Sequence, residues 1–212
     1  MKRVKLIFTL VLLLSFSFSQ AQDLKGFSQE ESIAFFGVDY SQTLFVGTDG
    51  FTDVEMIATY YPATWNSLFV EESKKYSIKK TLDKELVHYS LKTVDSINGK
   101  ITKNDVELRL GNSLEGDKLL NIDKAKKTAL TYSLKSTNYK YGAIVFATEY
   151  NKLIKRGSYI IVVLNLEKNI VVFTKQFEGK AKGFGFRNYW AGSYYDGLSS
   201  LAKVYKKELK NL

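Results

Sequence analysis

The sequence predicts an α/β fold, with α+β as the alternative: a single mixed sheet, amphipathic helices packed on it, and a long C-terminal helix. Three observations lead to this prediction. Two adjacent runs are rich in β-branched and aromatic residues, the C-terminus carries an apolar stripe of helical period, and strand and helix patterns alternate along the chain.

The last third of the chain carries the clearest strand pattern. Tyr159–Leu166 and Ile170–Phe177 are dense in Val, Ile, Tyr and Phe, which favour buried strands. Residues 167–169 between them are polar and end in Asn, which tolerates positive φ, so a hairpin turn is expected. A third run, Ala143–Thr148, precedes the pair, and three neighbouring strands suffice for a sheet.

A long helix is expected after the glycine-rich segment 179–188, with Asn188 as its N-cap. Its apolar residues recur every three or four positions: Trp190, Tyr194, Leu198, Leu201, Ala202, Tyr205 and Leu209. Lysines crowd the last turns, where cations complement the helix dipole. Gly192 and Gly197 lower the helix propensity, which indicates either close packing against the sheet or a frayed start.

The first half of the chain predicts a strand followed by helices. Ser32–Tyr40 forms the strand, and Leu44–Val46 extends it or pairs with it. After a turn at 47–50, Thr52 or Asp53 caps a helix that begins at residue 54. Pro62 lies inside this helical pattern, so we expect a kink or two consecutive helices with Pro62 in the first turn of the second.

The middle of the chain predicts short strands and one further helix. Tyr76–Lys80 and Leu86–Val94 are expected to be strands, the second because apolar and polar residues alternate. Segment 106–110 also alternates and predicts a strand, with a helical start as the alternative. A loop over 112–121 leads to a helix capped by Asp123 that ends near residue 138.

The N-terminus predicts export from the cytoplasm. Residues 1–21 form a secretory signal, because three cations precede an apolar run and positions 19–21 offer small residues for cleavage. Residues 22–212 are expected to form a single globular domain in the periplasm or at the outer membrane of a Gram-negative bacterium. The chain has no cysteine, which excludes disulfides and the lipid-bearing cysteine of bacterial lipoproteins.

Composition and charge narrow the classes of partner. The net charge is +9, of which the signal contributes three, and the remaining charges are scattered. Nucleic acid is not expected as a partner of an exported chain without a binding motif. No apolar run after the signal is long enough for a transmembrane helix. No pattern indicates a cofactor or a metal site.

Three groups of residues are candidates for a binding or catalytic site. Lys182 and Arg187 lie beside glycines before a helix and form a candidate anion site. The spacing matches no phosphate-binding motif, however, and a flexible joint or a bulge is the favoured interpretation of these glycines. His88, the one histidine, is expected on the solvent face of a strand. Carboxylates at positions 49, 53 and 55 are expected in turn and capping roles rather than in cation binding.

The aromatic residues are the best functional lead. The chain holds 14 Tyr, 14 Phe and 2 Trp. Several flank the starts of predicted helices, and consecutive helical residues cannot all face the core. Core and rim packing is the favoured explanation, and an aromatic contact surface is the functional one. The candidate surface consists of Tyr60, Tyr61, Trp65, Tyr189, Trp190, Tyr194 and Tyr195.

The final third also resembles a group of envelope proteins. The segment YGAIVFATEYNKLIKRGSYIIVVLNLEKNIVVFTKQFEGKAKGFGFRNYW, followed by an amphipathic helix, resembles the closing half of this group in layout. The group includes the amino-terminal domain of the Tol translocation protein, the curli-secretion lipoprotein and the outer-membrane activators of penicillin-binding proteins. Such a resemblance implies a non-enzymatic scaffold or adaptor. It supplies no functional residue, and this chain lacks the lipid-anchoring cysteine.

These observations lead to one functional hypothesis and two alternatives. The hypothesis is a non-catalytic exported envelope module that binds or scaffolds a protein or a glycan through its aromatic surface. The alternatives are a carboxylate-dependent glycan hydrolase, which needs two acids in a cleft, and a carrier of a small apolar ligand between sheet and helix.

Overall fold

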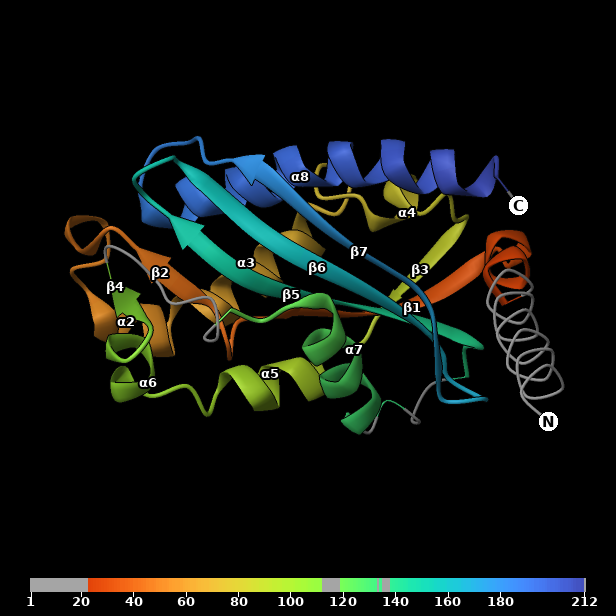
Figure 1. Ribbon diagram of the computed structural model, residues 1–212, viewed down its shortest axis with the longest axis horizontal. Helices are drawn as coiled ribbons and strands as arrows, with labels where there is room; N and C mark the ends of the chain where they lie inside the picture. The colour runs from red at the N-terminus through yellow and green to blue at the C-terminus, as the bar shows by residue number, and fades with distance from the viewer. Residues whose placement is uncertain (1–22, 112–118, 133, 135–137, 212) are drawn as a thin grey trace, which may run out of the picture.

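The computed structural model describes residues 23–111, 119–132, 134 and 138–211, which form a seven-stranded mixed sheet with helices on both faces (Figure 1). The strands are β1 (Ser32–Asp39), β2 (Leu44–Val46), β3 (Leu86–Tyr89), β4 (Leu110–Gly111), β5 (Tyr141–Asn151), β6 (Arg156–Asn165) and β7 (Ile170–Lys180). The predicted α/β class, mixed sheet and long C-terminal helix are confirmed.

The helices lie in two layers on either side of this sheet. They are the 3-10 helix η1 (Thr48–Gly50) and the helices α2 (Val54–Thr59), α3 (Tyr61–Glu71), α4 (Ile78–Thr81), α5 (Lys92–Asn98), α6 (Lys103–Glu107), α7 (Ile122–Thr131) and α8 (Phe186–Leu209). Figure 1 shows α8 and α4 along one side of the sheet, and α5 and α7 along the other.

The sheet has a parallel half and an antiparallel half. β1 and β2 lie one after the other along the same edge of β5 and run parallel to it. β3 and β4 continue this half outward, parallel to β1 and β2 respectively. On the other edge of β5, β6 and β7 form consecutive antiparallel pairs. The predicted 167–169 turn joins β6 to β7, with Asn169 at a φ of 53°.

Two side-chain amides close the gap between β1 and β2. A bulge at Gly37, with a φ of 97°, precedes this gap. Asn66 of α3 binds both the N–H and the carbonyl of Val38, at 2.8 and 3.0 Å. Asn98 of α5 accepts from the N–H of Tyr40 and donates to the carbonyl of Val38, each at 2.9 Å.

Two hydrophobic cores flank the sheet. The larger core lies beneath α3 and α8, where Trp65, Trp190 and Tyr194 contact the rings of Tyr150 and Tyr159. The smaller core lies beneath α5 and α7 and holds side chains such as Val94 and Ala129. Burial of both sheet faces explains why the central strands are apolar runs rather than alternating sequences.

Glycines allow α8 to approach the sheet closely. A Cβ added at Gly179 of β7 would lie 2.1 Å from the carbonyl oxygen of Ser193. A Cβ added at Gly197 would lie 2.9 Å from the ring of Phe177. Of the two interpretations of the helix glycines, close packing is therefore confirmed.

The predicted break at Pro62 is also confirmed. α2 ends at Thr59, and α3 begins at Tyr61 with Pro62 in its first turn, where the missing N–H costs no hydrogen bond. Asp53 caps α2 by accepting from the N–H of Met56 at 3.1 Å.

The short elements of the middle region differ from the prediction. Tyr76–Lys80 is not a strand, because Ser77 caps the helical turn α4. The strand predicted over Leu86–Val94 ends at Tyr89, and α5 begins three residues later. Segment 106–110 contains the end of α6, the helical start that the sequence left open, followed by the two-residue strand β4. Runs of four or five residues carry too few repeats of either period to decide between helix and strand.

Two predicted N-caps are also wrong. Asn188 lies inside α8, whose N-cap is Gly185. Asn121 rather than Asp123 caps α7, by accepting from the N–H of Lys124 at 2.9 Å, and α7 ends at Thr131 rather than near residue 138. Most of the predicted 112–121 loop, residues 112–118, lies outside the described residues.

Residues 23–29 are helical and are held by one lysine. Lys84 is 3 % exposed, and its ammonium donates to the carbonyl of Glu30 at 2.7 Å and to that of Phe27. A cation there complements the negative end of this helix. The predicted signal, 1–21, lies outside the described residues, and none of the described helices is long and apolar enough to span a membrane.

Candidate functional site: a groove between α3 and α8

Three of the seven aromatic residues in the predicted surface belong to the core. Trp65 and Trp190 are each 1 % exposed, and Tyr194 is fully buried. The indole N–H of Trp65 donates to the carbonyl of Arg187 at 2.8 Å, which ties α3 to the first turn of α8. These three residues cannot form a contact surface, so this part of the prediction is corrected in favour of core packing.

The other four aromatic residues lie at the rim of the core. Tyr60 and Tyr195 are exposed, whereas Tyr61 and Tyr189 are half-buried. Tyr61 stacks on Trp65, with ring centroids 5.4 Å apart. Tyr195 lies in a different place, across a groove from the residues that follow α3. Tyr60 and Tyr61 contact one another, with ring centroids 5.4 Å apart, and of the seven candidates only Tyr195 lines this groove.

We call this concavity the α3–α8 groove, and its volume is about 450 Å³. One wall consists of Glu72, Lys75 and Tyr76, which follow α3. The other wall consists of Lys182, Phe184, Arg187, Asn188 and Tyr195, from the β7–α8 loop and the first turns of α8. The predicted anion residues Lys182 and Arg187 are therefore together, as neighbours of one aromatic candidate, Tyr195.

The β7–α8 loop holds this wall in place. The N–H of Lys182 donates to the carbonyl of Tyr189 at 3.1 Å, so the loop folds back on the helix. Gly183 and Gly185 have φ angles of 131° and 76°, which other residues rarely adopt. The glycines that were predicted to form a joint thus let the loop fold back on α8. No side chain caps the N-terminus of α8.

The charge of the groove is net positive. Lys75 lies 3.0 Å from Glu72, and the adjacent Tyr76 phenol, together with Glu72, raises the pKa of Lys75. Lys182 lies 3.9 Å from Asp196. Among the described ion pairs none involves Arg187. The lining therefore offers a guanidinium and two lysines beside exposed aromatic rings, with Glu72 as its carboxylate.

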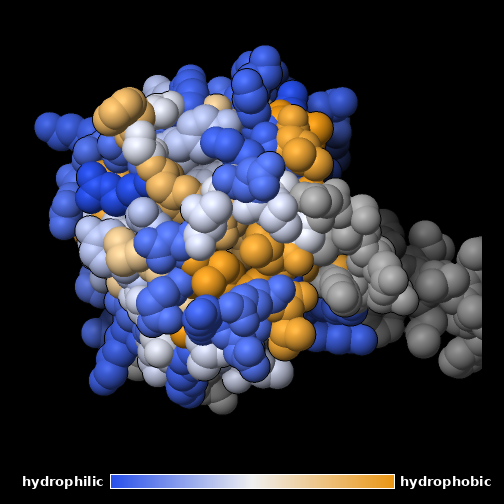
Figure 2. Space-filling model, turned by 90° about the vertical axis from the view of Figure 1, so that its left-hand side faces the viewer, coloured by the Kyte–Doolittle hydropathy of each residue, from blue (hydrophilic) through white to orange (hydrophobic). Residues whose placement is uncertain are grey.

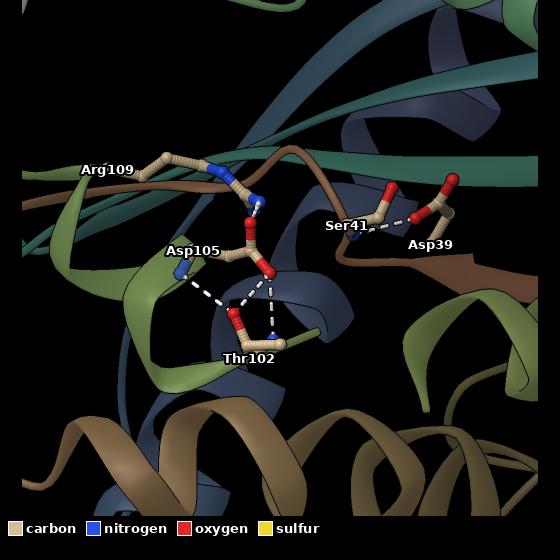
Figure 3. Close-up of polar contacts among 5 residues, drawn as sticks. All are labelled: Asp39, Ser41, Thr102, Asp105 and Arg109. Carbon is tan, nitrogen blue, oxygen red and sulfur yellow. Dashed lines mark hydrogen bonds and ion pairs between the residues drawn. The ribbon is translucent and has the colours of Figure 1, made fainter. Parts of the chain in front are cut away.

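A second polar cluster lies where β1 ends (Figure 3). Asp39 is 1 % exposed, and its carboxylate accepts from the N–H of Ser41 at 2.7 Å and from the hydroxyl of Tyr132 at 2.5 Å. In Figure 3 the Arg109 side chain, from the segment between α6 and β4, ends at Asp105, with which it is paired at 3.5 Å.

This second cluster has a structural role. Both carboxylate oxygens of Asp39 already accept hydrogen bonds, and they fix the turn after β1 and the end of α7. Thr102 and Asp105 form a capping box that begins α6. Burial and the Asp39 charge raise the pKa of Tyr132, so this phenol remains protonated and donates. The cluster leaves no free base or nucleophile beside a cavity.

The other acidic residues and the histidine considered above lie at helix starts or on exposed positions. Asp53 caps α2, and Asp49 lies exposed in η1. Glu55 lies in the first turn of α2, where an acidic side chain complements the helix dipole. His88 is exposed on β3 and stacks on Tyr139, with ring centroids 5.1 Å apart. Within the described part of the chain no group of acidic or histidine side chains could hold a metal ion.

Sequence reasoning missed one wall of the groove. Glu72 and Lys75 drew no attention because the segment after them was expected to be a strand rather than the turn into α4. Phe184, with 96 % of its surface exposed, was also missed. A phenylalanine between two glycines is a usable signal, because such a loop offers it no core to enter.

Comparison with known proteins adds no family to this description. No protein-family model matches the chain, and no curated protein sequence matches it. The layout resemblance to envelope proteins therefore stays a prediction.

Proposed function

We propose that the chain is a non-catalytic exported envelope module that binds an acidic glycan in the α3–α8 groove. One observation carries this proposal: the groove combines exposed aromatic rings with a net positive charge, in which Arg187 has no ion-pair partner among the described residues. Sugar rings present apolar C–H faces that stack on aromatic rings, and their hydroxyl and carboxylate groups bind charged and amide side chains. A volume of about 450 Å³ suits a few sugar units better than a protein surface.

Each side chain has a defined part in this proposal. Tyr195, 39 % exposed, supplies a stacking face, and Phe184 extends it at the mouth of the groove. The planar guanidinium of Arg187 matches a carboxylate in bidentate geometry. Asn188 and Glu72 offer an amide and a carboxylate to sugar hydroxyls.

The two alternative functions receive less support. A hydrolase needs two carboxyl groups facing one another across the sugar, whereas the lining of the groove provides Glu72 alone. A carrier needs an internal apolar cavity between sheet and helix. That space holds contacting rings, such as Tyr150 with Trp190 at 4.5 Å and Phe69 with Tyr194 at 4.3 Å between centroids.

The test is calorimetric titration of the chain from residue 22 with soluble peptidoglycan fragments, which carry carboxylates, and with neutral chito-oligosaccharides. We expect binding of the acidic fragments that weakens with salt. Arg187→Gln and Tyr195→Ser should each weaken it about tenfold, through loss of a charged hydrogen bond and of a stacking face. Lys206→Gln is the matched control, because it removes an exposed cation from the same helix far from the groove.

The outcomes separate the possibilities clearly. Equal affinity in Arg187→Gln, Tyr195→Ser and Lys206→Gln would contradict the groove as the site. Equal binding of neutral and acidic sugars would remove the role of charge. Release of reducing ends from the fragments would favour the hydrolase instead.

A further inference from the structure

Two apolar loop tips project from one end of the molecule. Leu153 and Ile154, in the turn between β5 and β6, are 63 % and 60 % exposed. Phe184, in the β7–α8 loop, is 96 % exposed. Figure 1 places both loops at the left-hand end of the sheet, and Figure 2 looks onto that end, where apolar patches lie among hydrophilic side chains.

The two loops are neighbours, and a hydrogen bond between backbone groups joins them. Arg156 pairs with Lys180 at the last position of the β6–β7 ladder, so the strands bring both loops to the same end. The N–H of Ala181 then donates to the carbonyl of Lys155 at 2.8 Å. The two loops therefore lie side by side at this end of the molecule, and we call the end that carries Leu153, Ile154 and Phe184 the tip surface.

The β5–β6 turn is held in shape. The side-chain oxygen of Asn151 accepts from the N–H groups of Leu153 and Ile154, at 3.1 and 3.2 Å. A Cβ added at Gly47 would lie 3.3 Å from the Leu153 side chain, so this side chain rests against the η1 turn. The apolar side chains are presented by a preorganised turn, which lowers the entropy cost of binding.

Cations surround these apolar side chains. The two loops and the strand ends beside them carry Lys152, Lys155, Arg156, Lys180 and Lys182, and Arg187 follows in the first turn of α8. Glu178 pairs with Arg156 at 2.7 Å, and Asp196 lies near Lys182, so these acids offset part of the charge. A net positive rim around exposed apolar tips remains.

We propose that the tip surface docks on an anionic phospholipid membrane. Leu153, Ile154 and Phe184 enter the interface between headgroups and acyl chains, and the surrounding lysine and arginine side chains contact lipid phosphates. Apolar tips alone would fit a protein as well, whereas a ring of cations around them complements a uniformly negative surface. This inference goes beyond glycan binding and places the groove, which shares Phe184, beside the membrane.

The test is co-sedimentation of the chain from residue 22 with sucrose-loaded vesicles. One set contains phosphatidylcholine with phosphatidylglycerol, and the other contains phosphatidylcholine alone. We expect binding to the anionic set and a loss of binding as salt rises. Leu153→Ser with Ile154→Ser should lower the partition coefficient about tenfold, because both side chains leave water on docking. Lys155→Glu with Lys180→Glu should lower it to a similar extent.

Leu86→Ser is the matched control. Leu86 is 56 % exposed but lies on β3, away from the tip surface, so its replacement should leave partitioning unchanged. Far-UV circular dichroism checks that every variant is folded. The Leu153 and Ile154 variant should retain glycan affinity, since neither residue lines the groove, so the two proposals fail separately.

Three results would overturn the proposal. The first is no partitioning of the unmodified chain into anionic vesicles. The second is equal binding to both vesicle sets, and the third is an equal loss in Leu86→Ser and in the tip variant. Self-association of the unmodified chain that the tip variant abolishes, without vesicle binding, would assign the surface to protein docking and reject the membrane.

Discussion

At the scale of single residues, two tyrosines of the larger core differ in whether the hydroxyl group has a hydrogen-bond partner. The rings of Tyr159 and Tyr194 contact one another at 5.4 Å between centroids, and both are fully buried. The Tyr159 hydroxyl lies 2.6 Å from Ser193 Oγ, whose own proton is directed to the carbonyl of Trp190. Tyr159 is therefore the donor of that bond. The buried Tyr194 hydroxyl has no hydrogen-bond partner among the residues that the structure describes.

This difference predicts opposite effects of one substitution. Tyr194→Phe removes a buried polar group without a partner and should raise the free energy of unfolding by about 1 kcal/mol. Tyr159→Phe removes a donor and leaves Ser193 Oγ short of a partner, which should lower it by about 1 kcal/mol. Urea unfolding followed by Trp fluorescence measures both. A loss of stability in Tyr194→Phe would mean that this hydroxyl has a bonding partner, such as buried water.

The same residues show what local pattern could and could not predict. The helical stripe through Trp190 and Tyr194 identified both as core-facing, yet they also entered the candidate surface with their neighbours Tyr189 and Tyr195. Two neighbouring residues of a helix can be assigned to its core-facing or its solvent-facing side only when the positions of the core-facing stripe are known. For α8 the stripe is long, so its phase was the better guide. For Trp65 the break at Pro62 left few turns from which to judge.

At the scale of elements, the contact between α8 and the loop before it depends on Gly192. A Cβ added at this position would lie 2.0 Å from the carbonyl oxygen of Lys182. Helix propensity alone predicts that Gly192→Ala stabilises α8 by about 1 kcal/mol. The clash with backbone outweighs this gain, because the loop must move and give up its bond to the carbonyl of Tyr189.

We therefore predict that Gly192→Ala lowers the free energy of unfolding by about 2 kcal/mol. It should also weaken glycan binding, since the displaced loop carries one wall of the groove. Ser199→Ala, at an exposed position of the same helix, is the control and should be neutral or slightly stabilising. Chemical denaturation of both variants gives the comparison. A stabilised Gly192→Ala would show that the loop yields at little cost.

Element predictions were reliable in proportion to length. The long strands β5, β6 and β7 were found because their runs of β-branched and aromatic residues are long, and α8 was found because many of its residues repeat the helical period. The short helices α4 and α5 were predicted as strand, and the strand predicted over 106–110 is reduced to the two residues of β4, because the conformation of such short segments depends on partners far away in the chain. Asn98 of α5, for example, is positioned by backbone groups of Val38 and Tyr40. Single-segment pattern contains no information on such contacts.

At the scale of the whole molecule, the arrangement of helices on a sheet could be predicted from the sequence, whereas only one of the two walls of the groove could. Strand and helix order indicated a mixed sheet with helices on it, as observed. Lys182, Arg187 and Tyr195 lie close together in the sequence, so one wall of the groove could be proposed. The opposite wall comes from Glu72 and Lys75, more than a hundred residues earlier, and only the packing of α3 against α8 brings it there.

The dense packing of phenols also predicts how the whole domain responds to alkali. Burial raises the pKa of Tyr40, Tyr150, Tyr159 and Tyr194 above the ordinary value of 10. In the unfolded chain these phenols lose their protons near pH 10, whereas in the folded protein they keep them. Above pH 10 the folded state therefore binds more protons, and its stability falls as pH rises.

Lys84 acts in the opposite direction over a lower range. Burial lowers the pKa of Lys84 from its ordinary 10.5 to about 8, so between these values the unfolded chain binds more protons at this site. Its contribution to stability therefore grows from pH 8 to about 10.5. Below pH 10 the phenols are protonated in both states and do not oppose this amine, so stability should rise between pH 8 and about 10. Above pH 10 it should decrease steeply, by about 1.4 kcal/mol per pH unit for each buried phenol.

The measurement is urea unfolding at a series of pH values, with phenolate absorbance recorded in parallel. We expect the unfolding midpoint to collapse within about two pH units above 10, with ionisation of the buried phenols coinciding with loss of structure. Tyr194→Phe should shift this collapse to higher pH, because one fewer buried phenol is available to ionise. Exposed Tyr60 provides the control, since Tyr60→Phe should leave the alkaline midpoint unchanged. Ionisation of the buried phenols in the folded protein near pH 10, with the unfolding midpoint preserved, would show instead that the core admits solvent to these hydroxyls.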